Sequence, residues 1–189
     1  MNLINATTSE LIYIADRAGY DAVSPRFIPM NVPGEFKQSP IDKQMIEATK
    51  IALKTTGIKV LDIELARITE DCDPRNFDRA LELGGELGAK RMIMSAWTTD
   101  RTDRNFIVDC FSETCEIAFQ YGLSVDLEFP SFSRLRTLDE ALDIVRAAKQ
   151  PNGGILVDTL YLHLSRVELA ELLHVPGEFI NFLHISDAL

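Results

Sequence analysis

The feature that most constrains the fold is a regular alternation of helical and strand-like segments along the 189 residues. Segments that open on a capping residue and close at glycine or proline predict helices at 7–19, 40–57, 73–88, 103–122, 137–150 and 167–177. Apolar runs between them predict strands at 20–27, 58–68, 89–97, 123–130, from Gly153 onward, and 179–189. This αβ unit, repeated six times, predicts a parallel sheet with crossover helices.

Capping residues define several helix ends. Thr137 with Glu140 is expected to form a capping box at the start of one helix. Ser39 is expected to cap a helix that opens at Pro40. Gly19 and Gly57 are expected to end their helices in the left-handed conformation.

Two folds fit this pattern, an open doubly wound sheet and a (β/α)₈ barrel. No strand is followed by the glycine pattern of a dinucleotide or phosphate loop, which weighs against the doubly wound fold. Polar groups end several predicted strands, as in a barrel whose active site gathers at the carboxyl ends of its strands. These groups are Arg26, Glu64 with Arg67, Glu128 and Asp158.

The predicted architecture is therefore one α/β domain over residues 1–189, a TIM barrel incomplete at its C-terminus. A full barrel needs about 250 residues. The sequence offers six clear strands, and residues 1–5 are a candidate for one more, which makes about six to seven.

Composition excludes several function classes. The formal net charge of −10 argues against a nucleic-acid partner and against an anionic membrane surface. No apolar run approaches the roughly 18 residues of a membrane span, and the N-terminus does not have the features of a signal peptide. Three cysteines without metal-type spacing are expected to be free thiols in a reducing cytoplasm.

Three strand ends carry a potential ligand set for a metal. Side chains alternate between the two faces of a strand, so Glu128, Asp158 and His184 can all point into the barrel mouth. Two carboxylates and one imidazole suit a divalent ion such as Mn²⁺, Mg²⁺, Co²⁺ or Zn²⁺. Such an ion would stabilise an enediolate while a carboxylate moves protons at the adjacent carbon.

Other polar and aromatic residues are candidates for substrate contacts. Arg26 can hold a phosphate or carboxylate, with a solvated strand end as the alternative. Glu64 and Arg67 can line the pocket or form a salt bridge. Trp97 can provide a platform for a sugar face or pack at the barrel rim.

The segment from Gly122 to Ser165, with Leu183–Ala188 and residues 17–29, resembles the xylose isomerase-like TIM-barrel superfamily. The resemblance is to the sugar phosphate isomerase/epimerase branch, related to ketose 3-epimerases, inosose dehydratase and the type-four endonucleases. It covers nearly the whole chain.

The resemblance implies a metal site made of Glu, Asp, His and a second Glu on four strand ends. The first three match Glu128, Asp158 and His184, and Glu128 would also be catalytic, whereas the second Glu has no counterpart. Many members carry a histidine where this chain has Tyr161, which makes Tyr161 a candidate for substrate contact. His163 has the same strand parity, and it either substitutes for that histidine in catalysis or packs.

The leading hypothesis is a cytoplasmic, metal-dependent isomerase or epimerase in carbohydrate metabolism, acting on a small sugar or polyol through an enediolate. A dehydratase of a cyclic polyol or hydroxy acid needs the same groups and stays open, as does a degenerate barrel without activity. A nuclease is disfavoured by the charge and by the presence of only three histidines. Completion of the barrel by a second copy, as a homo-oligomer, is a further alternative.

Overall fold

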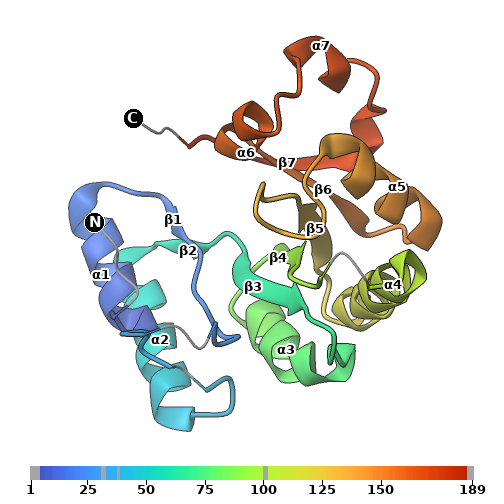
Figure 1. Cartoon of the computed structure of the whole chain (residues 1–189). Helices are drawn as coiled ribbons and strands as arrows, with labels where there is room; N and C mark the ends of the chain where they lie inside the picture. Colours follow the sequence, from blue (N-terminus) through green and yellow to red (C-terminus); the bar gives the residue numbers. More distant parts are fainter. Residues whose placement is uncertain (1–4, 31–32, 38, 100–101, 187–189) are drawn as a thin grey trace.

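The fold is a curved parallel sheet with helices on its outer side (Figure 1). The computed structural model describes residues 5–30, 33–37, 39–99 and 102–186. Its strands are β1 (Ala22–Val23), β2 (Lys59–Val60), β3 (Ile63–Ile68), β4 (Arg91–Ala96), β5 (Ser124–Glu128), β6 (Gly153–Asp158) and β7 (Ile180–His184).

The strands follow one another in sequence order across the sheet. β1 pairs with β2, and β3 to β7 form a five-stranded sheet, every pair being parallel. A parallel bridge between Arg26 and Glu64 links the chain after β1 to β3. All the strands therefore run in the same direction around the arc, and their carboxyl ends meet on one side.

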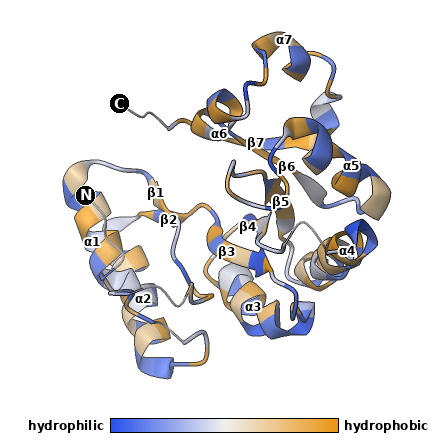
Figure 2. Ribbon diagram, in the orientation of Figure 1, coloured by the Kyte–Doolittle hydropathy of each residue, from blue (hydrophilic) through white to orange (hydrophobic). Residues whose placement is uncertain are grey.

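Most of the helices lie on the outer side of the arc, whereas the short helix that directly follows β6 lies at the carboxyl end of that strand. The helices are α1 (Thr8–Ala18), α2 (Lys43–Thr56), α3 (Asp78–Glu86), α4 (Arg104–Gln120), α5 (Leu138–Ala148), α6 (Thr159–Leu164) and α7 (Leu169–Leu172), with 3₁₀ turns η1 (Pro74–Phe77) and η2 (Gly177–Phe179). Among them, α4 packs on β5 and α5 on β6. Hydrophobic and hydrophilic stretches alternate along these helices (Figure 2), as expected of elements with one buried face.

The core lies between the strands and the outer helices. Phe111 of α4, Leu127 of β5 and Ile144 of α5 are at most 1% exposed. A smaller apolar cluster joins α1 and α2 to β1, with Ile12 and Ala52 fully buried. Burying side chains of this size contributes about 1.5–3 kcal/mol each for the larger ones, so the sheet is a rigid support for the residues at its carboxyl ends.

The predicted caps are confirmed at most helix ends. Thr137 and Glu140 form the expected capping box, and Gly19 and Gly57 end their helices with φ of 79° each. The predicted start of α2 at Pro40 is wrong. That helix begins at Lys43, because the Asp42 side chain, rather than Ser39, accepts the first free N–H groups.

Several further boundaries differ from the sequence prediction, and the strand predicted at 20–27 is reduced to the two residues of β1. The strand predicted at 58–68 is interrupted between β2 and β3, where Asp62 turns into the interior. The helix predicted at 73–88 opens with η1, and the one predicted at 167–177 is reduced to α7 with η2 after it. The candidate strand at 1–5 lies, apart from Asn5, outside the described residues.

Two expectations from composition can be compared with the structure. All three cysteines, Cys72, Cys110 and Cys115, are free thiols, as predicted. Within the described part of the chain, no helix combines the length and the apolar character that a membrane crossing requires.

Candidate metal centre

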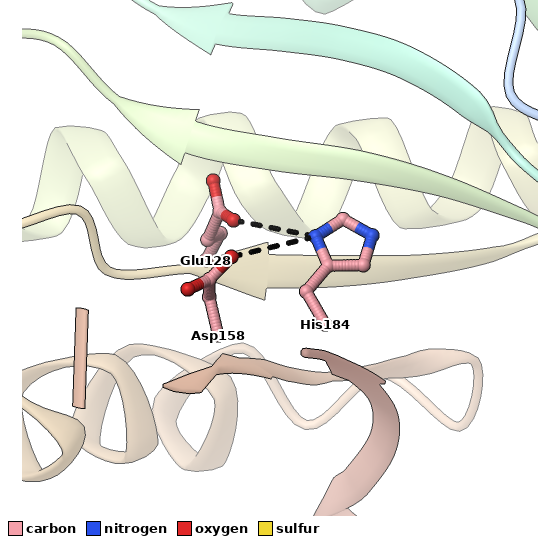
Figure 3. Close-up of side chains that lie close together, drawn as sticks. All are labelled: Glu128, Asp158 and His184. Atoms are coloured by element: carbon pink, nitrogen blue, oxygen red, sulfur yellow. Dashed lines mark ion pairs between the residues drawn. The ribbon is translucent and has the colours of Figure 1, made fainter. Parts of the chain in front are cut away.

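Glu128, Asp158 and His184 are the last residues of three adjacent strands, β5, β6 and β7. His184 lies directly opposite Asp158 in the ladder. Its Nδ1 atom is 3.8 Å from Glu128 Oε1 and 3.8 Å from Asp158 Oδ2 (Figure 3). One ligand atom from each residue lies within 4.8 Å of the others. The structure therefore brings together the three residues predicted as metal ligands.

Asp158 is held in place by its own backbone surroundings. Its Oδ1 atom accepts hydrogen bonds from the N–H groups of Leu160 and Tyr161, which makes it the N-cap of α6. Its Oδ2 atom accepts a 2.8 Å bond from the Ser186 hydroxyl and faces His184. Thr159 completes the junction by exchanging two bonds with the Ser186 backbone. Oδ1 therefore caps α6, whereas Oδ2 lies in the cluster with His184.

Burial and charge shift the acid–base behaviour of the cluster. Burial raises the pKa of Glu128, which is 8% exposed, and the His184 imidazole lowers that pKa only in part. Glu128 in turn raises the pKa of His184. Asp158 adds like-charge repulsion to Glu128. A cation between these groups would relieve both the repulsion and the cost of burying two carboxylates.

The donor set fits a divalent metal ion. Two carboxylate oxygens and an imidazole nitrogen are ligands that Mn²⁺, Co²⁺ and Zn²⁺ accept, and the carboxylates also suit Mg²⁺. The Nδ1 atom of His184, the one turned toward the carboxylates, is the nitrogen available as a ligand. At 3.8 Å from each carboxylate, the Nδ1 atom of His184 is too far away for a direct hydrogen bond, which leaves room for an ion between the three groups.

A cavity of about 280 Å³ opens next to the three residues. It is lined by Glu128, Asp158 and His184 together with Arg26, Met30, Glu64, Leu65, Ile93, Trp97, Pro130, Phe132 and Tyr161. All four residues predicted to contact substrate, namely Arg26, Glu64, Trp97 and Tyr161, therefore line this cavity.

Arg26 and Glu64 form an ion pair at the cavity wall. Arg26 Nη2 lies 2.7 Å from Glu64 Oε2, and both side chains are about 30% exposed. Arg67 donates to the Met30 carbonyl at 2.8 Å and lies 5.3 Å from the centre of the Trp97 ring. Both guanidinium groups therefore already have partners within the protein.

Three aromatic rings form one wall of the cavity. Trp97 and Phe132 meet edge to face at 5.3 Å, and Phe132 meets Tyr161 in the same way at 5.8 Å. Trp97 Nε1 donates to the Ser95 hydroxyl, which fixes the indole. Sequence reasoning missed Phe132 and Met30. The available signal for Phe132 was its position in the loop after β5, where barrels place functional residues.

His163 does not join this group of residues. The prediction that it shares a side with Tyr161 assumed a strand, but both residues belong to α6. Residues two apart in a helix point about 200° apart, so Tyr161 faces the cavity while His163 is exposed to solvent.

The fold and the site together define a parallel α/β barrel protein with a cavity beside the carboxyl ends of β5, β6 and β7. A family model described as xylose isomerase-like TIM barrel matches residues 12–189. The chain belongs to that family, which confirms the predicted fold class and the resemblance.

Curated relatives and solved structures agree with this assignment. Inosose isomerase of Bacillus velezensis is 26% identical over 98% of this chain and 69% of its own length. The solved structure of the IOLI protein with a binding zinc atom has a TM-score of 0.78 at 22% identity, over 98% of this chain and 69% of that one. The 3-keto-D-glucoside 4-epimerase of E. coli has a TM-score of 0.77 at 20% identity, over 99% and 76%.

Proposed function

We propose that this protein is a divalent-metal-dependent isomerase or epimerase of a sugar-like polyol. The observation that carries the proposal is the convergence of Glu128, Asp158 and His184 beside a cavity of about 280 Å³. The relatives named inosose isomerase and 3-keto-D-glucoside 4-epimerase support a ketone-bearing polyol as the substrate class. The zinc atom of the IOLI structure supports a metal at such a site, without deciding which metal this chain uses.

The proposed reaction depends on a bound divalent ion and on Glu128 as the group that moves the proton. A bound divalent ion would supply Lewis-acid stabilisation for negative charge on the substrate oxygens. We assign proton removal from the carbon beside the substrate carbonyl, which yields an enediolate, to Glu128. Its Oε1 atom faces His184, and Oε2 is the atom we assign to the proton. Burial raises the pKa of Glu128 toward the range in which a carboxyl both accepts and returns a proton.

The cavity wall favours an uncharged substrate over a phosphorylated one. Among the described lining residues Arg26 is the one guanidinium, and its ion pair with Glu64 neutralises it. A phosphate would have to break this pair, whereas sugar hydroxyls can bond to either partner. Trp97, Phe132 and Tyr161 offer the apolar surface on which the C–H face of a sugar ring packs.

Glu128→Gln tests the proposal. Wild-type protein loaded with Mn²⁺ or Co²⁺ is expected to exchange the hydrogen next to the carbonyl of a keto-cyclitol or keto-sugar in D₂O, as followed by NMR. The variant should exchange at least about 100-fold more slowly, because the proton acceptor is lost. It should also hold less metal in elemental analysis.

The matched control is Glu86→Gln, which alters an exposed acid paired with Lys50 and should change neither measurement. Equal metal content in wild type and Glu128→Gln would exclude the proposed centre. A product lighter by one water would assign the site to a dehydratase instead.

A further inference from the structure

Strand β7 contains one extra residue relative to its neighbour β6. Ile180 pairs with Ile155, but the next pair along β6 is Leu156 with Phe182, which leaves Asn181 as the bulge. A bulge shifts the register of everything that follows it and re-aims a side chain. Because of this shift His184 lies opposite Asp158. A slip by one residue would turn the imidazole to the other face of the sheet.

The side chain of Asn181 crosses β6 to contact β5. Its Nδ2 atom donates to Asp126 Oδ1 at 2.9 Å. The path runs over Gly154, the residue paired with Asp126 in the ladder. A Cβ at position 154 would lie 2.1 Å from that same Nδ2 atom. The absence of a side chain at Gly154 is therefore what leaves room for the bond between Asn181 and Asp126.

Arg91 of β4 contacts the same bulge. Its Nη1 atom donates to the Asn181 carbonyl at 2.7 Å and lies 3.3 Å from Asp126 Oδ2. Its guanidinium lies 4.7 Å from the centre of the Phe182 ring, which in turn meets the His184 ring edge to face at 5.1 Å. The contacts thus run without interruption from β4 to the imidazole.

We propose that Arg91, Asp126 and Asn181 form an inner clamp that fixes the bulge in β7 and thereby positions the imidazole of His184. The role of His184 as a ligand rests on the function proposed above. Asp126 is fully buried and the Arg91 side chain is 23% exposed, so this ion pair gains little net stability, since the desolvation of Asp126 offsets the attraction. In some proteins such a pair instead selects one register among alternatives. All three are positioning residues.

Asn181→Ala tests the clamp through the metal. In titrations with Co²⁺ followed by its visible absorption, the variant should bind about 10-fold more weakly and give altered bands, because the imidazole is no longer held. The control is Asn152→Ala, which removes side-chain bonds to the carbonyls of Cys115 and Leu123. It should lower stability without changing the Co²⁺ affinity or spectrum. Equal affinity and spectra in wild type and Asn181→Ala would count against the clamp.

Gly154→Ala gives a sharper test as part of a double-variant cycle. Alone it should weaken Co²⁺ binding about as much as Asn181→Ala, because the new methyl group displaces the carboxamide. In the Asn181→Ala background it should add almost nothing, since there is no carboxamide left to displace. Fully additive effects would show that Gly154 acts in some other way and would overturn this step.

Hydrogen exchange separates a failure of the clamp from a failure of the metal centre. In metal-free protein, the amides of 180–184 should exchange faster in Asn181→Ala than in wild type or Asn152→Ala. If wild type binds no Co²⁺, the metal centre is excluded, and the exchange rates alone decide whether the clamp holds β7. Unchanged exchange together with unchanged Co²⁺ binding would reject the clamp.

Discussion

Asp62 is a carboxylate with no exposed surface, at the interruption between β2 and β3. Its Oδ2 atom accepts a bond from the Ser24 hydroxyl, whereas its Oδ1 atom has no partner among the described residues. Burial raises the pKa of Asp62 to about 6. The hydrogen bond from Ser24 lowers this pKa, but it offsets the effect of burial only in part. Near neutral pH the folded chain therefore keeps a buried, half-satisfied charge.

This shift predicts how stability depends on pH. The folded-state pKa lies above the unfolded value, so the contribution of Asp62 is fully present below about pH 4 and is lost as the pH rises through 6. Between pH 4.5 and 8, metal-free wild type should lose about 1–2 kcal/mol more unfolding free energy than Asp62→Asn. Urea unfolding at the two pH values measures the difference.

Asp143→Asn is the matched control for this prediction. Asp143 is an exposed acid whose pKa is lowered by Arg104, so its own titration lies below this window. The pH dependence of that variant should match wild type above pH 4.5. If Asp62→Asn did the same, the assignment of the raised pKa to Asp62 would be wrong.

At the residue scale, the cluster could be predicted from the sequence. Side chains alternate between the two faces of a strand, and all the strands run in the same direction, so the positions of their last residues follow. Glu128, Asp158 and His184 each end a parallel strand on its inward face, so they had to converge. The Asn181 bulge could not be predicted, because an extra residue in a ladder depends on contacts with distant chain segments. Without that bulge, the register of β7 would shift by one residue, and the prediction that His184 lies beside Asp158 would have failed.

At the element scale, the junction of β6 and α6 explains the wrong placement of His163. The apolar run continues past Asp158 through Leu160 and Leu162, and periodicity alone does not separate a buried strand from a short helix. The sequence does contain the N-cap signal, because Asp158 immediately precedes the first helical residue of α6. Asp158 is both the N-cap of α6 and a member of the cluster with Glu128 and His184.

Two substitutions of Asp158 should separate its two roles. Asp158→Ala removes the cap of α6, a six-residue helix too short to be stable alone, and should cost about 1 kcal/mol of metal-free stability. Asp158→Asn keeps an oxygen for the N–H groups of Leu160 and Tyr161 and removes repulsion from Glu128. It should be at least as stable as wild type without metal.

Both variants should bind Co²⁺ more weakly than wild type, because an amide or a methyl group replaces the charged group that we propose as a ligand. Thermal unfolding in EDTA reports the cap, and Co²⁺ titration reports the ligand. Equal destabilisation of Asp158→Asn and Asp158→Ala would mean that the cap contributes nothing to the stability of this junction.

At the scale of the whole molecule, the parallel arrangement concentrates acidic groups at one side of the arc. Glu128 and Asp158 at the carboxyl ends of β5 and β6, together with Glu64 near the start of β3, line one cavity in a chain whose formal net charge is already −10. The alternation of helices and strands made this convergence predictable. The lining by Met30 and Phe132 was not, because loop residues follow no period that a sequence reveals.

This concentration of charge predicts that a divalent ion reverses the pH dependence of stability. Without metal, the raised pKa values of Glu128, His184 and Asp62 all make stability fall as the pH rises. With metal, the ligands must lose protons to bind, so the stabilisation by the ion grows as the pH rises. Thermal unfolding at pH 5.5 and 8 should give the higher midpoint at pH 5.5 in EDTA and at pH 8 with excess Co²⁺.

Glu128→Gln provides the control for this reversal. It removes one proposed ligand, so the Co²⁺-dependent rise in the midpoint at pH 8 should largely vanish, while the fall with pH that Asp62 causes should persist in EDTA. A wild-type midpoint that responds to Co²⁺ equally at both pH values would show that the ion binds elsewhere. The sign of the slope, rather than the size of any one midpoint, therefore decides whether these three strand ends form a metal site.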